Sequence, residues 1–201
     1  MNLQSVFDYR SPYAYLANTR LPDFDTPISY FAIDILEVMK KVNNQPSPAC
    51  PAKAKYSGID AARWAAVYGV PLAPNGAFFQ AMRAGQVEGA ILARAALAAQ
   101  QTGSFEVVHP ALFQAVWAGT DDLITAEGRS TFLKKLGVDE DIWQLADRPA
   151  VRDQLAANNE EAARRGVFGV PTFFCDDELY FGNDRLDFVR AALQKAKGVS
   201  K

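Results

Sequence analysis

The segment from Phe7 to Ala17 places a hydroxyl side chain where a strand-like run gives way to a helix-like one. Ser11 comes directly before Pro12. A serine oxygen can accept a hydrogen bond from a free N–H of the first helical turn, and proline suits the first helical position. The same hydroxyl can donate to a ligand, and the helix dipole favours a nearby anion. Taken alone, the residues favour a helix cap, a role that is compatible with chemistry at Ser11.

The other reactive side chains are few. Cys50 and Cys175 are far apart in the sequence and form no C-x-x-C pair, so neither a disulfide framework nor a zinc site is expected. A thioredoxin-like oxidant needs a thiolate at the helix start and a second cysteine three residues later, but Ser11 and Ala14 hold these positions. His109 is the only histidine, and we predict a cap or surface residue there, with no triad and no metal.

Composition excludes several classes of protein. The chain has 201 residues, of which 49% are hydrophobic and 22% charged, as in ordinary globular proteins. The net charge of −2 gives no electrostatic attraction to nucleic acid. No apolar run is long enough to span a membrane, and the first residues do not form a signal peptide. We therefore expect a cytoplasmic protein.

A short strand, a helix and a second strand must position Ser11. The strands are predicted over Leu3–Tyr9 and Ile28–Ile33, and the helix runs from Pro12 until Leu21-Pro22 ends it. Because a helix connects them, the two strands should be parallel. An Asn- and Pro-rich loop over 43–51 follows.

An alanine-rich helical block separates this unit from the C-terminal strands. Helices are predicted over Asp60–Tyr68, Ala81–Gln101, Pro110–Ala118, Arg129–Leu136 and Arg148–Arg165. A hairpin then turns at Asp176-Asp177, between Pro171–Cys175 and Glu178–Phe181, and a last helix follows. Together, the two ends make an α/β sheet of about four strands with helices on both faces. Residues 1–40 and 166–201 would form one domain, and 41–165 a helical domain inserted into it.

The order β-α-β, then β-β-α, is that of the thioredoxin fold, whose reactive residue lies at the position of Ser11. Four motifs resemble those of the 2-hydroxychromene-2-carboxylate isomerases, relatives of kappa-class glutathione transferases and, more distantly, of bacterial disulfide oxidases. They lie in Phe7–Tyr13, Arg63–Pro71, Val167–Thr172 and Phe181–Leu186. The resemblance covers essentially the whole chain.

This resemblance implies a glutathione site. Ser11 would hold the glutathione thiolate. Val170 and a cis Pro171 would pair with the cysteine of glutathione, and the γ-glutamyl end would lie at Phe181, Gly182, Asn183 and Asp184. The Asp184 carboxylate could pair with the α-amino group of glutathione, and Asn183 could bind its α-carboxylate. Alternatively, Asp184 could simply cap the last helix. Asn44 and Lys53 would face the substrate, with Lys55 in place of Lys53 in a shifted alignment.

The implied activity is a cis/trans isomerisation by reversible thiol addition to a conjugated, aromatic-derived carboxylate, as in aromatic degradation, with glutathione as a recycled cofactor. The first alternative is a kappa-like glutathione transferase or peroxidase that consumes glutathione. A binding protein without turnover and a disulfide oxidoreductase are weaker alternatives. Ala77 stands where relatives often carry a substrate-facing Asn, and Phe78-Phe79 would make that wall more apolar, which leaves the acceptor open. The resemblance also implies a homodimer.

Overall fold

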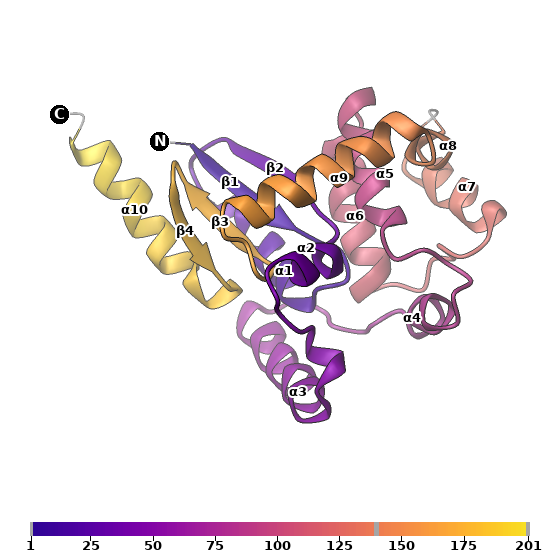
Figure 1. The fold of residues 1–201 in the computed structure, drawn as a ribbon, viewed down its shortest axis with the longest axis horizontal. Helices are drawn as coiled ribbons and strands as arrows, with labels where there is room; N and C mark the ends of the chain where they lie inside the picture. Colours follow the sequence, from indigo (N-terminus) through magenta and orange to yellow (C-terminus); the bar gives the residue numbers. More distant parts are fainter. Residues whose placement is uncertain (1, 139–140, 200–201) are drawn as a thin grey trace.

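The computed structural model describes residues 2–138 and 141–199 and contains one mixed sheet (Figure 1). Its strands are β1 (Leu3–Phe7), β2 (Ile28–Ala32), β3 (Thr172–Cys175) and β4 (Glu178–Phe181), in the order β2-β1-β3-β4. β1 pairs with β2 in parallel, and the other two pairs are antiparallel. The predicted four strands, the parallel first pair and the C-terminal hairpin are therefore confirmed.

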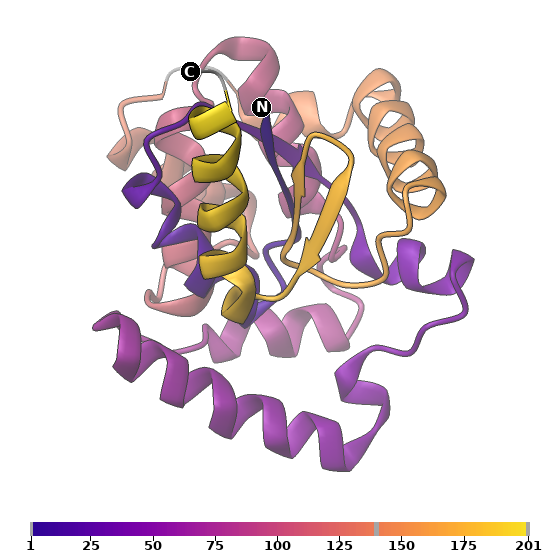
Figure 2. The same ribbon diagram turned by 90° about the vertical axis from the view of Figure 1, so that its left-hand side faces the viewer.

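Helices cover both faces of this sheet, because side chains alternate along β1. Leu3 faces α1 (Pro12–Asn18) and α10 (Leu186–Val199), in a core shared with Phe173 and Val189. Val6 faces α2 (Ile35–Lys41) and α9 (Pro149–Arg164), in a core shared with Phe174. Figure 2 shows α9 and α10 on opposite sides of the β3–β4 hairpin.

The helical insertion between β2 and β3 differs in detail from the prediction. Its remaining helices are α3 (Pro51–Tyr68), α4 (Gly76–Arg83), α5 (Ile91–Thr102), α6 (Phe105–Trp117), α7 (Ala126–Lys135) and α8 (Ile142–Ala146). The single helix predicted over 81–101 is wrong: the chain leaves α4 at Ala84, and Gly85 adopts a φ of +71°. The short helices α2 and α8 were not predicted. Three 3-10 turns complete the elements of the described ranges: η1 (Leu21–Asp23), η2 (Ser47–Ala49) and η3 (Asn183–Arg185).

The insertion packs against the sheet through a common core. Phe7 of β1 and Ala32 of β2 belong to the same buried cluster as residues of α5 and α6, among them Leu92 and Leu112. The division into domains 1–40 with 166–201 and 41–165 stays a prediction, and this continuous core argues for cooperation between the two parts. No helix in the described ranges is long and apolar enough to cross a membrane.

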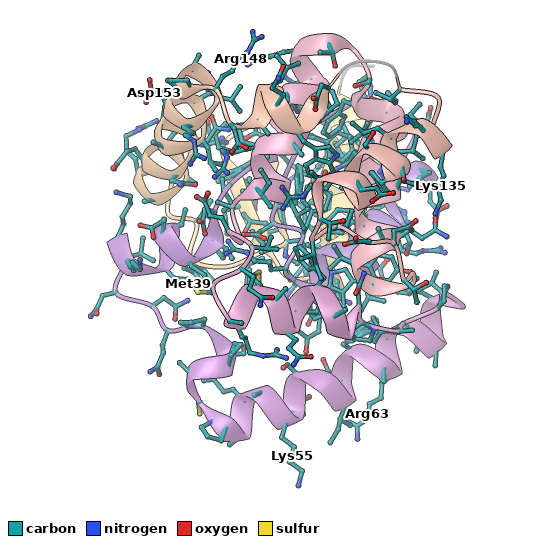
Figure 3. All side chains as sticks on the ribbon, turned by 90° about the vertical axis from the view of Figure 1, so that its right-hand side faces the viewer. Met39, Lys55, Arg63, Lys135, Arg148 and Asp153 are labelled. Atoms are coloured by element: carbon teal, nitrogen blue, oxygen red, sulfur yellow. The ribbon has the colours of Figure 1, made fainter. Side chains whose placement is uncertain are left out.

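Helix α3 stands apart from the rest of the insertion. It passes beside α1 at the lower edge of the molecule (Figure 2), and only Ala61 and Ala65 on it are buried. Figure 3 shows Lys55 and Arg63 on this helix, with their side chains directed away from the body of the protein. Its inner face packs Ala61 and Ala65 into the hydrophobic core and also makes hydrogen bonds near Ser11 through Asp60 and Tyr68.

Candidate active site at the start of helix α1

Ser11 makes two hydrogen bonds at once. Its backbone is extended (φ −95°, ψ 120°), and its oxygen accepts from the N–H of Ala14 at 3.2 Å, which confirms the predicted cap. The same hydroxyl donates to the carbonyl oxygen of Val170 at 3.1 Å. Ser11 is therefore not only a cap, because it also joins the start of α1 to the segment before β3.

Val170 and Pro171 form the opposite side of the site. The peptide bond between them is cis. The carbonyl of Pro171 accepts from the N–H of Gly182 at 2.9 Å, so the end of β4 lies against the start of β3. The structure thus brings three sequence-predicted groups together: Ser11, the Val170-Pro171 pair and the loop after Phe181.

That loop is held from α3. Gly182 adopts a φ of +110°, which disfavours any side chain there. Asn183 is only 3% exposed, and its carbonyl accepts from the Tyr68 hydroxyl at 3.1 Å. Asp184 is exposed and lies inside η3, where its carboxylate pairs with Arg185, and α10 begins only at Leu186. Asn183 therefore supports the loop from within, whereas Asp184 faces solvent.

An exposed aromatic pair lies beside Val170. Phe168 and Phe181 are 41% and 40% exposed, and the centroids of their rings are 4.6 Å apart. Gly169 lies under this pair, since a Cβ there would come within 2.5 Å of the Phe181 ring. Phe168 was not among the predicted site residues, although it stands within the Val167–Thr172 motif.

The two predicted substrate residues differ in their placement. The amide of Asn44 donates to the carbonyl of Phe168 at 2.7 Å, which joins the loop after α2 to the site. Lys53 is exposed on the first turn of α3. It lies about two helical turns from Asp60, on the same face, and Asp60 accepts from the Tyr13 hydroxyl at 3.0 Å. Lys53 is thus on the α1 side of α3, but outside the hydrogen-bonded group around Ser11.

The two cysteines lie outside the candidate site around Ser11. Cys175 is buried in β3, and burial raises the pKa of its thiol to about 11. Cys50 is partly exposed at the start of α3 and is a free thiol. In the described part of the chain, no three His, Cys, Asp or Glu side chains lie together in a way that could hold a metal ion.

Two predictions from the sequence are wrong. His109 is neither a cap nor a surface residue, because α6 begins four residues before it and places it in an aromatic core, 3% exposed. Its ring bonds the Tyr9 hydroxyl and the Asn18 side chain, each at 2.9 Å, and burial lowers its pKa to about 3. Phe78 lines no acceptor wall, since its side chain is fully buried.

Sequence reasoning also missed a charged cluster directly before Ser11. Arg10 forms ion pairs with both Asp8 and Asp34, and all three side chains are almost fully buried. The available signal was local: two charged residues follow a buried strand within the first motif. Their pairing with Asp34, at the end of the neighbouring strand, follows from the parallel pairing of β1 and β2.

Comparison with known proteins fits this geometry. Residues 2–194 match the DSBA-like thioredoxin domain family. A 2-hydroxychromene-2-carboxylate isomerase of Pseudomonas sp. (strain C18) is 33% identical over 197 residues, covering 93% of this chain and 87% of that protein. A solved structure of such an isomerase matches with a TM-score of 0.82 at 28% identity, covering 98% of this chain and 96% of that one. Glutathione S-transferase kappa 1 of Caenorhabditis elegans is 23% identical over 201 residues, covering 94% and 89%.

The fold and these matches define a thioredoxin-like protein, and the chain belongs to the DSBA-like thioredoxin domain family. Within that family, it is similar to 2-hydroxychromene-2-carboxylate isomerases over nearly its whole length. The predicted fold class and the stated resemblance are both confirmed.

Proposed function

We propose that the protein is a glutathione-dependent isomerase of the 2-hydroxychromene-2-carboxylate type. It would interconvert cis and trans forms of a conjugated, aromatic-derived carboxylate. One observation carries the proposal: the Ser11 hydroxyl, at the start of α1, bonds the carbonyl of Val170, and Ser11 and Ala14 stand where a redox protein would have cysteines. The similarity to named isomerases over nearly the whole chain supports the substrate class.

The groups around Ser11 suit a thiol-containing peptide. Beside Pro171, Val170 offers its main-chain N–H and carbonyl for a short peptide ladder, the mode in which extended peptides bind. Asp184 offers an exposed carboxylate to an amino group, and Asn183 holds the loop in place through Tyr68. When bound, glutathione supplies the thiolate that adds reversibly to the conjugated carbon.

Ser11 can donate a hydrogen bond to this thiolate without losing its role as the cap of α1. Its hydroxyl has one proton to donate and lone pairs with which to accept. Redirecting the proton from the Val170 carbonyl to a sulfur exchanges one hydrogen bond for another, while the Ala14 N–H stays capped. The start of α1 therefore keeps its geometry when the hydroxyl changes partner.

The acceptor would lie between the aromatic pair and α3. The exposed face of Phe168 and Phe181 offers a stacking surface for a ring. Asn44 orients this face through the Phe168 carbonyl, and Lys53 provides a positive charge for the substrate carboxylate. Together these groups favour a flat, anionic acceptor.

The second candidate is a kappa-like transferase or peroxidase that consumes glutathione. Ala77 favours it, since this exposed residue on α4 replaces the Asn expected for the isomerases. A homodimer and a cytoplasmic location are further proposals that rest on the resemblance, and the need for reduced glutathione fits that compartment.

The deciding experiment follows 2-hydroxychromene-2-carboxylate by absorbance, with and without glutathione, and titrates free thiol before and after. We expect interconversion only with glutathione and no loss of free thiol. Ser11→Ala should lower kcat/KM by about 100-fold, the usual effect of losing a hydrogen bond to developing charge. Ser130→Ala, on the exposed surface of α7, is the control.

Each other outcome has a meaning. Stoichiometric loss of thiol would favour the transferase. If wild-type protein showed no glutathione-dependent interconversion and no thiol loss, the proposal would be wrong in both forms.

A further inference from the structure

The turn that carries Ser11 is built on three buried charged side chains. Asp8, Arg10 and Asp34 expose 3%, 10% and 13% of their side chains. The Nε of Arg10 donates to one oxygen of Asp8 at 3.0 Å, and its terminal nitrogen binds both Asp8 and Asp34. Burial alone would lower the pKa of Arg10, but the two carboxylates outweigh burial and raise it, so the guanidinium stays charged.

The main chain around Ser11 depends on this cluster. The Asp8 carboxylate accepts from the N–H groups of Arg10 and Ile35, each at 2.9 Å. The Asp8 carbonyl accepts from the N–H of Ser11 at 3.1 Å, which closes the turn. Asp34 caps α2 through the N–H of Leu36 at 3.0 Å. The cluster thus joins the ends of β1 and β2 directly beneath Ser11.

The guanidinium occupies a place kept open by a glycine. A Cβ on Gly89, in the segment between α4 and α5, would lie 2.6 Å from an Arg10 nitrogen and 3.1 Å from the Met82 sulfur. Arg10 therefore fills a specific space inside the fold, unlike a long side chain on the surface.

The charge of the cluster has a consequence for Ser11. Two carboxylates and one guanidinium sum to −1, and without Arg10 the sum would be −2. Asp8 and Ser11 are three residues apart in a closed turn, so their Cα atoms lie within about 7 Å. At this range a buried charge strongly affects a neighbouring ionisation. An anion at Ser11 would be repelled more strongly if Arg10 were absent.

We propose that Arg10 is a positioning residue that sets how much negative charge the Ser11 position accepts. It does so by neutralising one of the two carboxylates under the Ser11 turn and by holding that turn in place. A role of Arg10 in catalysis rests on the proposed function, the thiolate chemistry at Ser11. Its physical content, the charge balance beneath Ser11, can be measured without glutathione.

Other ionisable groups face the same end of α1. Asp60 of α3 binds Tyr13, whose pKa is raised by burial and by this hydrogen bond, so Tyr13 stays neutral. Asp184 of η3 is paired with Arg185. His109 of α6 lies toward the other end of α1, where it bonds Asn18, and it is neutral at ordinary pH. Arg10 directly precedes Ser11 in the sequence, and its guanidinium is paired with the two carboxylates of the cluster.

The test introduces a thiol as a reporter. In Ser11→Cys, the pKa of the introduced thiol is read from thiolate absorbance against pH, after subtracting the spectrum of the same protein without this substitution. Adding Arg10→Gln should raise that pKa by about one unit, the lower end of the effect of a nearby charge. Adding Asp34→Asn, which can still cap α2, should lower it.

The signs of the two shifts in thiol pKa distinguish an effect of charge from structural damage. Damage alone would move both variants in the same direction, whereas the proposal requires a rise for Arg10→Gln and a fall for Asp34→Asn. Arg10→Lys should leave the thiol pKa near that of the parent although it loses the forked contact and some thermal stability. Arg164→Gln, on the exposed face of α9, changes the net charge equally and should leave the pKa unchanged.

If Arg10→Gln does not fold, Asp34→Asn decides alone: an unchanged or raised pKa would overturn the inference. The same holds if Arg10→Gln shifts the pKa no more than Arg164→Gln does. Glutathione binding is measured separately on the Ser11 protein by calorimetry. Absence of binding would remove the proposed function while leaving the thiol result intact.

Discussion

At the scale of single residues, a hydroxyl at Ser11 has an advantage over a thiol. It accepts from Ala14 and donates to Val170 at the same time, so the cap and the bond to Val170 use different parts of one group. It also cannot be oxidised to a disulfide, and the buried Cys175 has a pKa raised to about 11 by burial. Under the proposed function, Ser11 would assist the thiolate of glutathione without redox side reactions of its own.

His109 gives a prediction at the same scale. Burial lowers its pKa from 6.5 to about 3 in the folded protein. Between these values the unfolded chain binds the proton and the folded chain does not. The free energy of unfolding should therefore fall as pH drops below about 6.5, by up to 1.4 kcal/mol per pH unit.

Urea unfolding between about pH 5 and 7 measures how the free energy of unfolding changes with pH, in a range where most carboxylates stay ionised. His109→Gln keeps an acceptor for Tyr9 and a donor for Asn18 but does not titrate. We expect this variant to be less stable at neutral pH and to lose most of the slope. An unchanged slope in His109→Gln would show that another group is responsible.

At the scale of elements, the site is a junction of four segments. The start of α1, the start of β3, the loop before α10 and the loop after α2 meet through single hydrogen bonds from Ser11, Gly182 and Asn44. Helix α3 adds a fourth hydrogen bond, from Tyr68 to the carbonyl of the buried Asn183. Each bond fixes one segment, so removing one should loosen one part of the site.

Tyr68→Phe tests the contact from α3. It leaves the Asn183 carbonyl without its donor, at a cost of about 1–3 kcal/mol in stability. Because the loop after Phe181 loses its support, the glutathione dissociation constant should rise several-fold. Tyr56→Phe is the matched control, since this tyrosine lies on the same helix, is 59% exposed and bonds Asp60.

Calorimetric titration and thermal unfolding of both variants measure the two effects. If Tyr68→Phe binds glutathione as tightly as wild type, α3 does not position the loop.

Local signals explain which elements the sequence predicted. The strands, the parallel first pair and the Asp176-Asp177 turn follow from apolar runs and turn residues, which act over a few positions. The Ser11 cap is local in the same sense. The alanine-rich run over 81–101 hid the break at Gly85, since alanine favours a helix everywhere. The five-residue helix α8 is too short for a periodic signal.

Long-range contacts explain what the sequence could not show. Arg10 meets Asp34 across 24 positions, and Tyr68 meets Asn183 across 115. Neither pair has a periodic or turn-like signature. Asn183 consequently looked like a ligand-facing residue, although its side chain is directed into the protein.

At the scale of the whole molecule, buried polar bonds join the insertion to the sheet. The indole of Trp117 donates to the Tyr9 carbonyl at 2.7 Å, and Asn158 donates to the Ala32 carbonyl at 2.9 Å. Asn159 accepts from the N–H of Asp34 at 2.8 Å. Unfolding either part would leave the polar groups of the other without partners, so the two parts should unfold together.

The chain offers a separate probe for each part. All three tryptophans, Trp64, Trp117 and Trp143, lie in the insertion, and the buried Cys175 lies in β3 of the sheet. In a Cys50→Ser background, tryptophan fluorescence reports the insertion and thiol reactivity reports the sheet. We expect the two urea midpoints to coincide, the mark of a two-state transition. A lower midpoint for fluorescence alone would instead mean that residues 41–165 unfold as an independent domain. In that case the contacts of Trp117 and Asn158 would be too weak to couple the insertion to the sheet on which Ser11 is placed.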